Sequence, residues 1–288
     1  MDKKRFTVLG GDQRSVELAY LLIADGNEVQ MYGFDKLKLY LADNDSLEKA
    51  IVHSDVVVGP LPFSNDEITL NAPFFSGVIK NSEILDLLTN KQVFTAGKIN
   101  MEFQERANYN GLISVDYFYR EDMQVLNAIP TAEGAIQVAM ENMKITLHSS
   151  NALVLGYGRI GKALSKMLKG IGANVFVEAR DYADIAWIKN NGYTPIPLKD
   201  LRFNLSEMDV IFNTVPNVIL DETMLNKLSK NSLIVDLASK PGGVDIDKAK
   251  EYQVTAISAQ GLPGKVAPIT AAKVIKDTIY NIIKELEV

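Results

Sequence analysis

The sequence contains no cysteine and only two histidines in 288 residues. Without cysteine the chain has no disulfide, no thiolate metal site and no cysteine nucleophile, and such a composition is typical of a reducing compartment. The histidines, His53 and His148, belong to no His, Cys or carboxylate cluster at ligand spacing, so we predict no metal site. We expect each to be a cap or surface residue, and we do not expect histidine-based proton transfer.

Positive charge is also scarce, with 30 Lys and Arg residues against 36 Asp and Glu residues and a formal net charge of −6. This balance gives no broad basic surface, so we expect neither nucleic acid nor an anionic membrane as a partner, and local cations must bind any anionic ligand. No apolar run approaches the length of a membrane span, and the apolar run near residue 8 is too short for a signal peptide. We therefore expect a cytoplasmic protein.

Strand and helix patterns alternate twice along the chain, which predicts an α/β protein with two doubly wound Rossmann-like or flavodoxin-like domains joined by two crossing helices. The strands expected in the first domain are 6–9, 28–32, 55–58, 92–96 and 112–115, and those in the second are 152–155, 174–177, 193–196, 210–213, 233–236 and 254–257. We assign residues 1–130, completed by a helix at 268–288, to a substrate domain. Residues 131–267 are assigned to an NADP-binding domain.

The two crossing helices are predicted from start signals and apolar stripes. Pro130–Thr131 is typical of a helix start, and four apolar residues follow it at helical spacing: Ile136, Met140, Met143 and Leu147. A second apolar stripe follows Pro268. We expect the second helix to return to the first domain, so that the two crossings frame a cleft.

The most informative motif is a glycine-spaced turn between the apolar strand 152–155 and a helical pattern. Its residues are Gly156, Tyr157, Gly158, Arg159, Ile160 and Gly161. In a GxGxxG turn the first glycine permits the tight turn, the second lets backbone N–H groups approach a pyrophosphate, and the third allows close packing of helix and strand. Because a second strand follows at 174–177, the context predicts a dinucleotide site.

The end of that second strand bears on the choice of cofactor. Enzymes of this fold that use NAD place an acidic residue on the ribose 2′-OH about 20 residues into the motif. Here that position falls on Ala179, and Arg180 follows it. A guanidinium in place of a carboxylate suits a 2′-phosphate, so we predict NADP. The alternative is that Glu178 reaches the ribose and Arg180 is a solvated surface residue.

Two later strand ends are expected to face the cofactor, because ligands of open α/β sheets bind beyond the carboxyl ends of the strands. The predicted contacts are Thr214, Val215 and Pro216 in one loop and Leu237, Ala238 and Ser239 in the other. By the same rule, Asp12 and Arg14 follow the first strand of the N-terminal domain and are predicted substrate contacts. The alternatives are ordinary strand-to-helix turns and surface residues.

Several motifs along the whole chain resemble the family of the dipicolinate synthase A-subunit. The similar stretches are Val8–Asp12 with Arg14, Ile129–Thr131 with Glu133–Gly134, Gly156–Gly161, Asp236–Gly243, and Gly261–Gly264 with Val266–Pro268. The resemblance implies NADP-dependent oxidation of dihydrodipicolinate to dipicolinate in the mother-cell cytoplasm of sporulating bacteria. It also implies a partner, the smaller and flavoprotein-like B-subunit of dipicolinate synthase. We further expect a homo-oligomer.

A dicarboxylate substrate needs cationic or N–H partners. The expected cleft offers Arg14, Lys98, Lys240, Lys265 and the helix N-terminus that begins near Pro268. Since removal of a ring proton yields a stable aromatic pyridine, Asp12 or Lys240 alone could serve as the proton acceptor. The predicted catalytic residues are therefore Asp12, Arg14 and Lys240. One alternative is an NADP-dependent 2-hydroxy acid reductase, which the missing late-loop histidine disfavours. Another is a non-catalytic NADP-binding protein that organises a partner.

Overall fold

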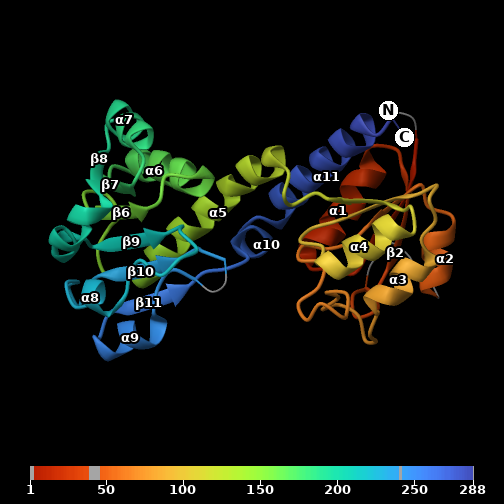
Figure 1. Ribbon diagram of the computed structural model, residues 1–288, viewed down its shortest axis with the longest axis horizontal. Helices are drawn as coiled ribbons and strands as arrows, with labels where there is room; N and C mark the ends of the chain where they lie inside the picture. The colour runs from red at the N-terminus through yellow and green to blue at the C-terminus, as the bar shows by residue number, and fades with distance from the viewer. Residues whose placement is uncertain (1–2, 39–45, 240–241, 288) are drawn as a thin grey trace. The chain divides into compact units, whose positions relative to one another are not determined.

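The computed structural model describes residues 3–38, 46–239 and 242–287 (Figure 1). The predicted catalytic residue Lys240 lies outside these ranges. By its internal contacts the chain divides into two compact units, of which unit 1 comprises Met1–Asn127 with Ala267–Val288, and unit 2 comprises Ala128–Val266.

Unit 1 is built on a five-stranded parallel sheet of order β2-β1-β3-β4-β5. Its strands are β1 (Arg5–Leu9), β2 (Glu28–Tyr32), β3 (Val56–Val58), β4 (Val93–Ala96) and β5 (Ile113–Asp116). Its helices are α1 (Gln13–Ala24), α2 (Leu47–Val52), α3 (Asn81–Leu87), α4 (Met101–Tyr109) and α11 (Pro268–Glu285). This is the flavodoxin-like order, and the chain direction across the sheet reverses between β1 and β3.

Helix α11 supplies much of the core of unit 1, although it is distant in sequence. Its side chains Ile275, Ile279 and Ile282 are buried in one cluster with Phe6 of β1 and Leu22 of α1. The apolar stripe that follows Pro268 in the sequence is therefore the face that packs on α1 and the sheet.

Unit 2 contains a six-stranded parallel sheet of order β11-β10-β9-β6-β7-β8. Its strands are β6 (Asn151–Leu155), β7 (Asn174–Ala179), β8 (Thr194–Pro197), β9 (Val210–Asn213), β10 (Leu233–Asp236) and β11 (Thr255–Ser258). Its helices are α6 (Arg159–Ile171), α7 (Tyr182–Asn190), α8 (Glu222–Leu225), α9 (Ile246–Glu251) and α10 (Leu262–Val266), with 3-10 turns at Leu198–Phe203 and Leu205–Glu207. When β6 is taken as the first strand, this order is that of the Rossmann fold. The order reverses at the switch point between β6 and β9.

Each strand predicted from the sequence is present, with ends that differ by no more than two residues. The prediction that a helix begins at Pro130 is wrong, because α5 (Glu121–Asn142) begins nine residues earlier and contains Pro130 in its interior. An interior proline loses its N–H bond to the carbonyl four residues before and crowds that carbonyl, but α5 continues through Pro130, and Glu121 and Asp122 in the first turn stabilise the helix start. Met143 and Leu147 lie beyond the end of α5.

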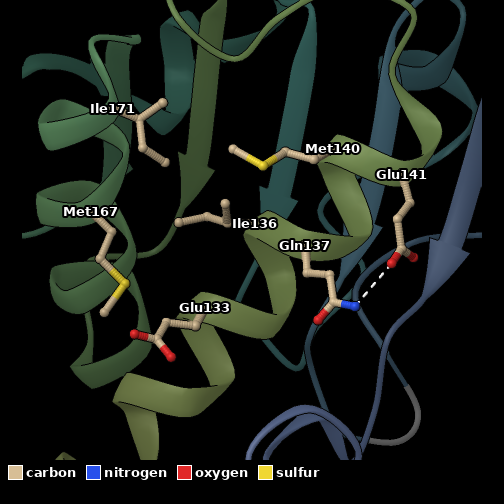
Figure 2. A pocket seen from close by; sticks show the side chains of 7 residues that line it. All are labelled: Glu133, Ile136, Gln137, Met140, Glu141, Met167 and Ile171. Atoms are coloured by element: carbon tan, nitrogen blue, oxygen red, sulfur yellow. Dashed lines mark hydrogen bonds between the residues drawn. The ribbon is translucent and has the colours of Figure 1, made fainter.

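An apolar groove lies between α5 and α6, with a cavity of about 540 Å³ (Figure 2). Ile136 and Met140 of α5 point toward Met167 and Ile171 of α6, as Figure 2 shows. On the outer side of α5, the Gln137 side chain donates a hydrogen bond of 2.9 Å to Glu141. None of the residues predicted to bind the cofactor lines this groove.

Candidate cofactor and substrate sites

The glycine-spaced turn joins β6 to α6 at the switch point of unit 2. Gly156 has φ +88°, a left-handed conformation that favours glycine, and Gly158 is the residue that caps α6. A Cβ atom on Gly161 would lie 2.1 Å from the Gly156 carbonyl oxygen, whereas one on Gly158 would meet no atom within 4 Å. The turn therefore leaves open space at a helix N-terminus, and this geometry fits a pyrophosphate group.

A cavity of about 210 Å³ lies beside this turn. Five of the residues predicted to bind the cofactor line it, namely Gly156, Tyr157, Ala179, Arg180 and Val215. Its other lining residues are Glu178, Asp181, Asp184 and Ile219. Ala179 is the last residue of β7, so the exposed Arg180 side chain follows directly at the carboxyl edge of the sheet. The location and size of this cavity fit the adenosine half of a dinucleotide, and we call it the adenosine cavity.

Glu178 is the only carboxylate in this cavity that is fully buried, with 2 % of its surface exposed. Within the described residues its Oε1 atom has no hydrogen-bond partner. Burial raises the pKa of the Glu178 carboxyl, and the nearby Arg180 charge only partly opposes this effect. An unpartnered buried acceptor is costly, so this oxygen is available to a hydroxyl donor of a ligand.

The two later loops are held together by a buried pair at the ends of β9 and β10. Asn213 Nδ2 donates to Asp236 Oδ1 at 2.7 Å and to the Val215 carbonyl at 3.0 Å. Asp236 also accepts from the backbone N–H groups of Ala238 and Gly243, both at 3.2 Å. The sequence analysis did not predict this hydrogen bond. The available signal was that two parallel strands, β9 and β10, each end in a polar residue.

The remaining predicted residues of these loops have different environments. The Thr214 hydroxyl donates to the Leu155 carbonyl at 2.8 Å, which fixes the loop against β6. Leu237 and Ala238 are buried, whereas Pro216 and Ser239 are exposed. Arg159 and Ile160 form the first turn of α6. All of these residues lie at the carboxyl edge of the unit 2 sheet.

In unit 1 the structure brings the predicted residues Asp12 and Arg14 into one ion pair. Asp12 caps α1, and its carboxylate accepts from Arg14 Nε at 2.9 Å and from Arg14 Nη2 at 2.8 Å. Arg14 Nη2 also donates to the Leu61 carbonyl, and only 8 % of the Arg14 surface is exposed. The guanidinium is thus fixed at the β1/β3 switch point, where ligands of such sheets bind.

A second cation is presented by a constrained turn after β4. Lys98 has φ +57°, which is unfavourable for a residue with a Cβ atom. Asp116, at the end of β5, accepts from the N–H groups of Lys98 at 3.2 Å and Ile99 at 2.7 Å. The Lys98 ammonium lies 4.9 Å from the centre of the Phe118 ring. Strained residues of this kind cluster at functional sites.

Both histidines lie at exposed positions away from these sites. His53 caps the C-terminus of α2, and His148 Nδ1 lies 2.9 Å from the Ser149 hydroxyl. Among residues 3–38, 46–239 and 242–287, no group of three or more His, Asp or Glu side chains is placed to hold a metal ion. In the same ranges, no helix has both the length and the apolar character needed to cross a membrane.

Comparison with known proteins agrees with this arrangement. Residues 5–118 match the family model for the N-terminal domain of the dipicolinate synthase A-subunit, and residues 123–244 match that for the D-isomer specific 2-hydroxyacid dehydrogenase, NAD binding domain. Over 287 residues the chain is 31 % identical to the dipicolinate synthase A-subunit of Bacillus subtilis (strain 168), covering 98 % of this chain and 97 % of that protein. The chain belongs to the dipicolinate synthase A-subunit family.

Two crystal structures of this family are similar to the whole chain. The structure from Bacillus subtilis has a TM-score of 0.89 and 30 % identity, covering 100 % of this chain and 98 % of that one. The structure from Bacillus halodurans has a TM-score of 0.88 and 28 % identity, covering 97 % of each chain. The predicted family and fold class are confirmed. Because residues 123–244 match an NAD-binding domain of the dehydrogenase type, the chain is a nicotinamide-dependent oxidoreductase.

Proposed function

We propose that the chain catalyses the NADP-dependent oxidation of dihydrodipicolinate to dipicolinate during sporulation. The observation that carries this proposal is the similarity to a dipicolinate synthase A-subunit over 98 % of the chain, together with a turn that fits a pyrophosphate. In the overall reaction the dihydropyridine ring loses one hydride and one proton and becomes an aromatic ring. The bound nicotinamide would supply the hydride acceptor.

In this proposal residues 131–267 form the NADP-binding domain. The N–H groups at the start of α6 bind the pyrophosphate, and the loops that Asn213 and Asp236 hold face the rest of the cofactor. Arg180 binds the 2′-phosphate, because it is an exposed guanidinium at the edge of the adenosine cavity. The competing arrangement, in which Glu178 accepts from the ribose 2′-OH, would favour NAD instead.

Residues 1–130, completed by 268–288, form the substrate domain in this proposal. Arg14 binds a substrate carboxylate, and its pairing with Asp12 and Leu61 fixes the orientation of the guanidinium. Asp12 or Lys240 accepts the ring proton. Because aromatisation itself favours loss of that proton, a strongly activated base is not required.

We also propose a cytoplasmic location in the mother cell, with the flavoprotein-like B-subunit of dipicolinate synthase as a partner and neither nucleic acid nor membrane. For the expected homo-oligomer, the groove of Figure 2 is the surface we favour. Glu133 and Glu141 of α5 border this groove. Ile136, Met140, Met167 and Ile171 lie between α5 and α6 and would form the apolar centre of a two-fold contact.

Two other functions are distinguished by one assay. The purified chain is mixed with dihydrodipicolinate and either NADP⁺ or NAD⁺, with and without the B-subunit, and pyridine and reduced-cofactor absorbance are followed. Turnover with NADP⁺ supports the proposal. Reduction of small keto acids without dihydrodipicolinate turnover would indicate a 2-hydroxy acid reductase. NADP binding with no turnover of either substrate, even when the B-subunit is present, would indicate a non-catalytic role.

Variants test the assigned residues in the same assay. Arg180→Ala should reduce the preference for NADP⁺ over NAD⁺ by about tenfold or more, since one charge-assisted interaction is worth about 1.5–3 kcal/mol. The exposed Arg202→Ala is the matched control and should leave the ratio unchanged. Arg14→Ala and Lys240→Ala should each weaken substrate use while NADP binding persists. Unchanged turnover in both would refute their assignment.

A further inference from the structure

Another cavity of unit 2 lies between α6, α7 and the start of β8, with a volume of about 350 Å³. Three aromatic residues, two lysines and one asparagine line it: Tyr157, Lys162, Lys166, Trp187, Asn191 and Tyr193. We call it the aromatic–lysine pocket. It shares Tyr157 with the adenosine cavity and no other lining residue, so it is a separate site that adjoins the glycine turn.

One aromatic residue of this pocket, Trp187, is largely exposed to solvent. Trp187 is the only tryptophan of the chain, and 59 % of its surface is exposed. It lines the same cavity as Tyr157 and Tyr193. Exposed aromatic groups gathered in a concave site are typical of ligand binding, because each ring offers a large face for stacking.

A hydrogen bond from Asn191 fixes one ring of the pocket, that of Tyr157, before any ligand arrives. Asn191 Nδ2 donates to the Tyr157 hydroxyl at 3.1 Å and to the Trp187 carbonyl at 2.9 Å. Tyr157 is itself mostly buried, with 7 % of its surface exposed. The end of α7 is thereby tied to the glycine turn, and the Tyr157 ring needs little ordering when a ligand binds.

The charge around the pocket is positive. Lys162 Nζ lies 5.4 Å from the centre of the Tyr157 ring, and Lys166 projects from the next turn of α6. Within the described part of the chain, neither ammonium group has a carboxylate within salt-bridge distance. The carboxylate near Tyr157, Asp184, lines the adenosine cavity instead.

We propose that the aromatic–lysine pocket is a second ligand site, which binds a planar aromatic anion. The ring of the ligand stacks on Trp187, and its carboxylate or phosphate group binds the ammonium groups of Lys162 and Lys166. Both parts of the chemistry are needed, since a ring alone leaves the two cations unpaired and a simple anion leaves the aromatic faces bare. The site is independent of the catalytic assignment, so it can be tested without turnover.

The test uses the fluorescence of Trp187, the only tryptophan of the chain, whose ring lines this pocket. The protein is saturated with NADP⁺ to fill the adenosine cavity, and a parallel series omits it. Three probes are titrated: pyridine-2,6-dicarboxylate, adenosine 5′-monophosphate and glutarate, a dicarboxylate without a ring. We expect saturable quenching by at least one aromatic probe, and the responding probe distinguishes a carboxylate from a phosphate ligand.

Variants then test whether the responding probe binds in the aromatic–lysine pocket. Replacing both lysines (Lys162→Ala with Lys166→Ala) should weaken binding of the responding probe about tenfold or more, as for the loss of charge-assisted contacts. Lys189→Ala on the exposed side of α7 is the matched control and should have no effect. Trp187→Ala, followed by calorimetry, should abolish binding, whereas Tyr182→Ala, an aromatic residue 88 % exposed on the same helix, should not.

Three outcomes overturn the proposal. The first is no saturable response to either aromatic probe. The second is binding that the double lysine variant leaves unchanged, because the probe would then occupy another site. The third is binding of glutarate as tight as that of pyridine-2,6-dicarboxylate, because the aromatic wall would then contribute nothing.

Discussion

Replacement of Asp236 tests whether the buried pair organises the cofactor loops. Asp236 is 2 % exposed and accepts three hydrogen bonds, from Asn213 Nδ2 at 2.7 Å and from the N–H groups of Ala238 and Gly243, each at 3.2 Å. Asp236→Ala removes all three acceptor contacts and leaves buried donors behind. Each unsatisfied buried donor costs about 1–3 kcal/mol.

The three donors do not all become unsatisfied, which limits the total loss of stability. Asn213 Nδ2 keeps its bond to the Val215 carbonyl, so the main losses are the two backbone N–H groups. We expect the free energy of unfolding of unit 2 to fall by about 3–5 kcal/mol. For a unit of this size, that change lowers the melting temperature by about 10 °C. The affinity for the cofactor should fall as well, because both loops lose their fixed geometry.

The assay is urea unfolding followed through the fluorescence of Trp187, which lies in unit 2 and therefore reports on that unit. Asp247→Ala, an exposed carboxylate in the first turn of α9, is the control and should change stability by no more than about 0.5 kcal/mol. Equal stability of the two variants, with equal cofactor affinity, would refute the role assigned to Asp236.

Three further predictions concern the glycine turn, its buried acid and the strained lysine. Gly161→Ala should abolish cofactor binding, measured by calorimetry, because its Cβ would lie 2.1 Å from the Gly156 carbonyl oxygen. The control, Gly170→Ala on the same helix, would place a Cβ with no atom within 4 Å. It should raise the free energy of unfolding by about 0.5–1 kcal/mol, measured in thermal melts. Burial raises the pKa of Glu178, so its contribution to stability is greatest at low pH and is lost as the pH rises through the folded-state pKa. Glu178→Gln should therefore raise the melting temperature at pH 8 but not at pH 4. Equal gains at both pH values would contradict burial as the cause. Lys98→Gly should stabilise unit 1 by about 1 kcal/mol through relief of the left-handed backbone, and a loss of stability in thermal melts would show that the conformation is not strained.

The strand pattern could be predicted because the strands of a parallel sheet are buried on both faces. Val56–Val58 and Val210–Asn213 have no exposed residue, and such short apolar runs followed by turns are easily found in a sequence. The glycine turn was equally accessible, since its conformation depends on local backbone geometry. These local features define the fold class and the position of the dinucleotide site.

Long-range pairing could not be predicted in the same way. The bond between Asn213 and Asp236 joins residues 23 positions apart, and it depends on which strands are neighbours in the sheet. The start of α5 was misplaced because Pro130 is a strong local signal, whereas the packing of residues on both sides of it continues the helix. Likewise, the sequence placed Asp12 and Arg14 together without indicating that they bind each other.

The route of the chain through the two units has a consequence for the order of folding during synthesis. Unit 2 is a continuous segment, Ala128–Val266, and contains every strand of its own sheet. The core of unit 1, in contrast, requires Ile279, Ile282 and Ile283 from α11, which follows unit 2 in the sequence and therefore leaves the ribosome after it. Unit 2 can therefore complete its core first, while the strands of unit 1 lack α11, and truncation before residue 268 should expose their apolar surface to chaperones.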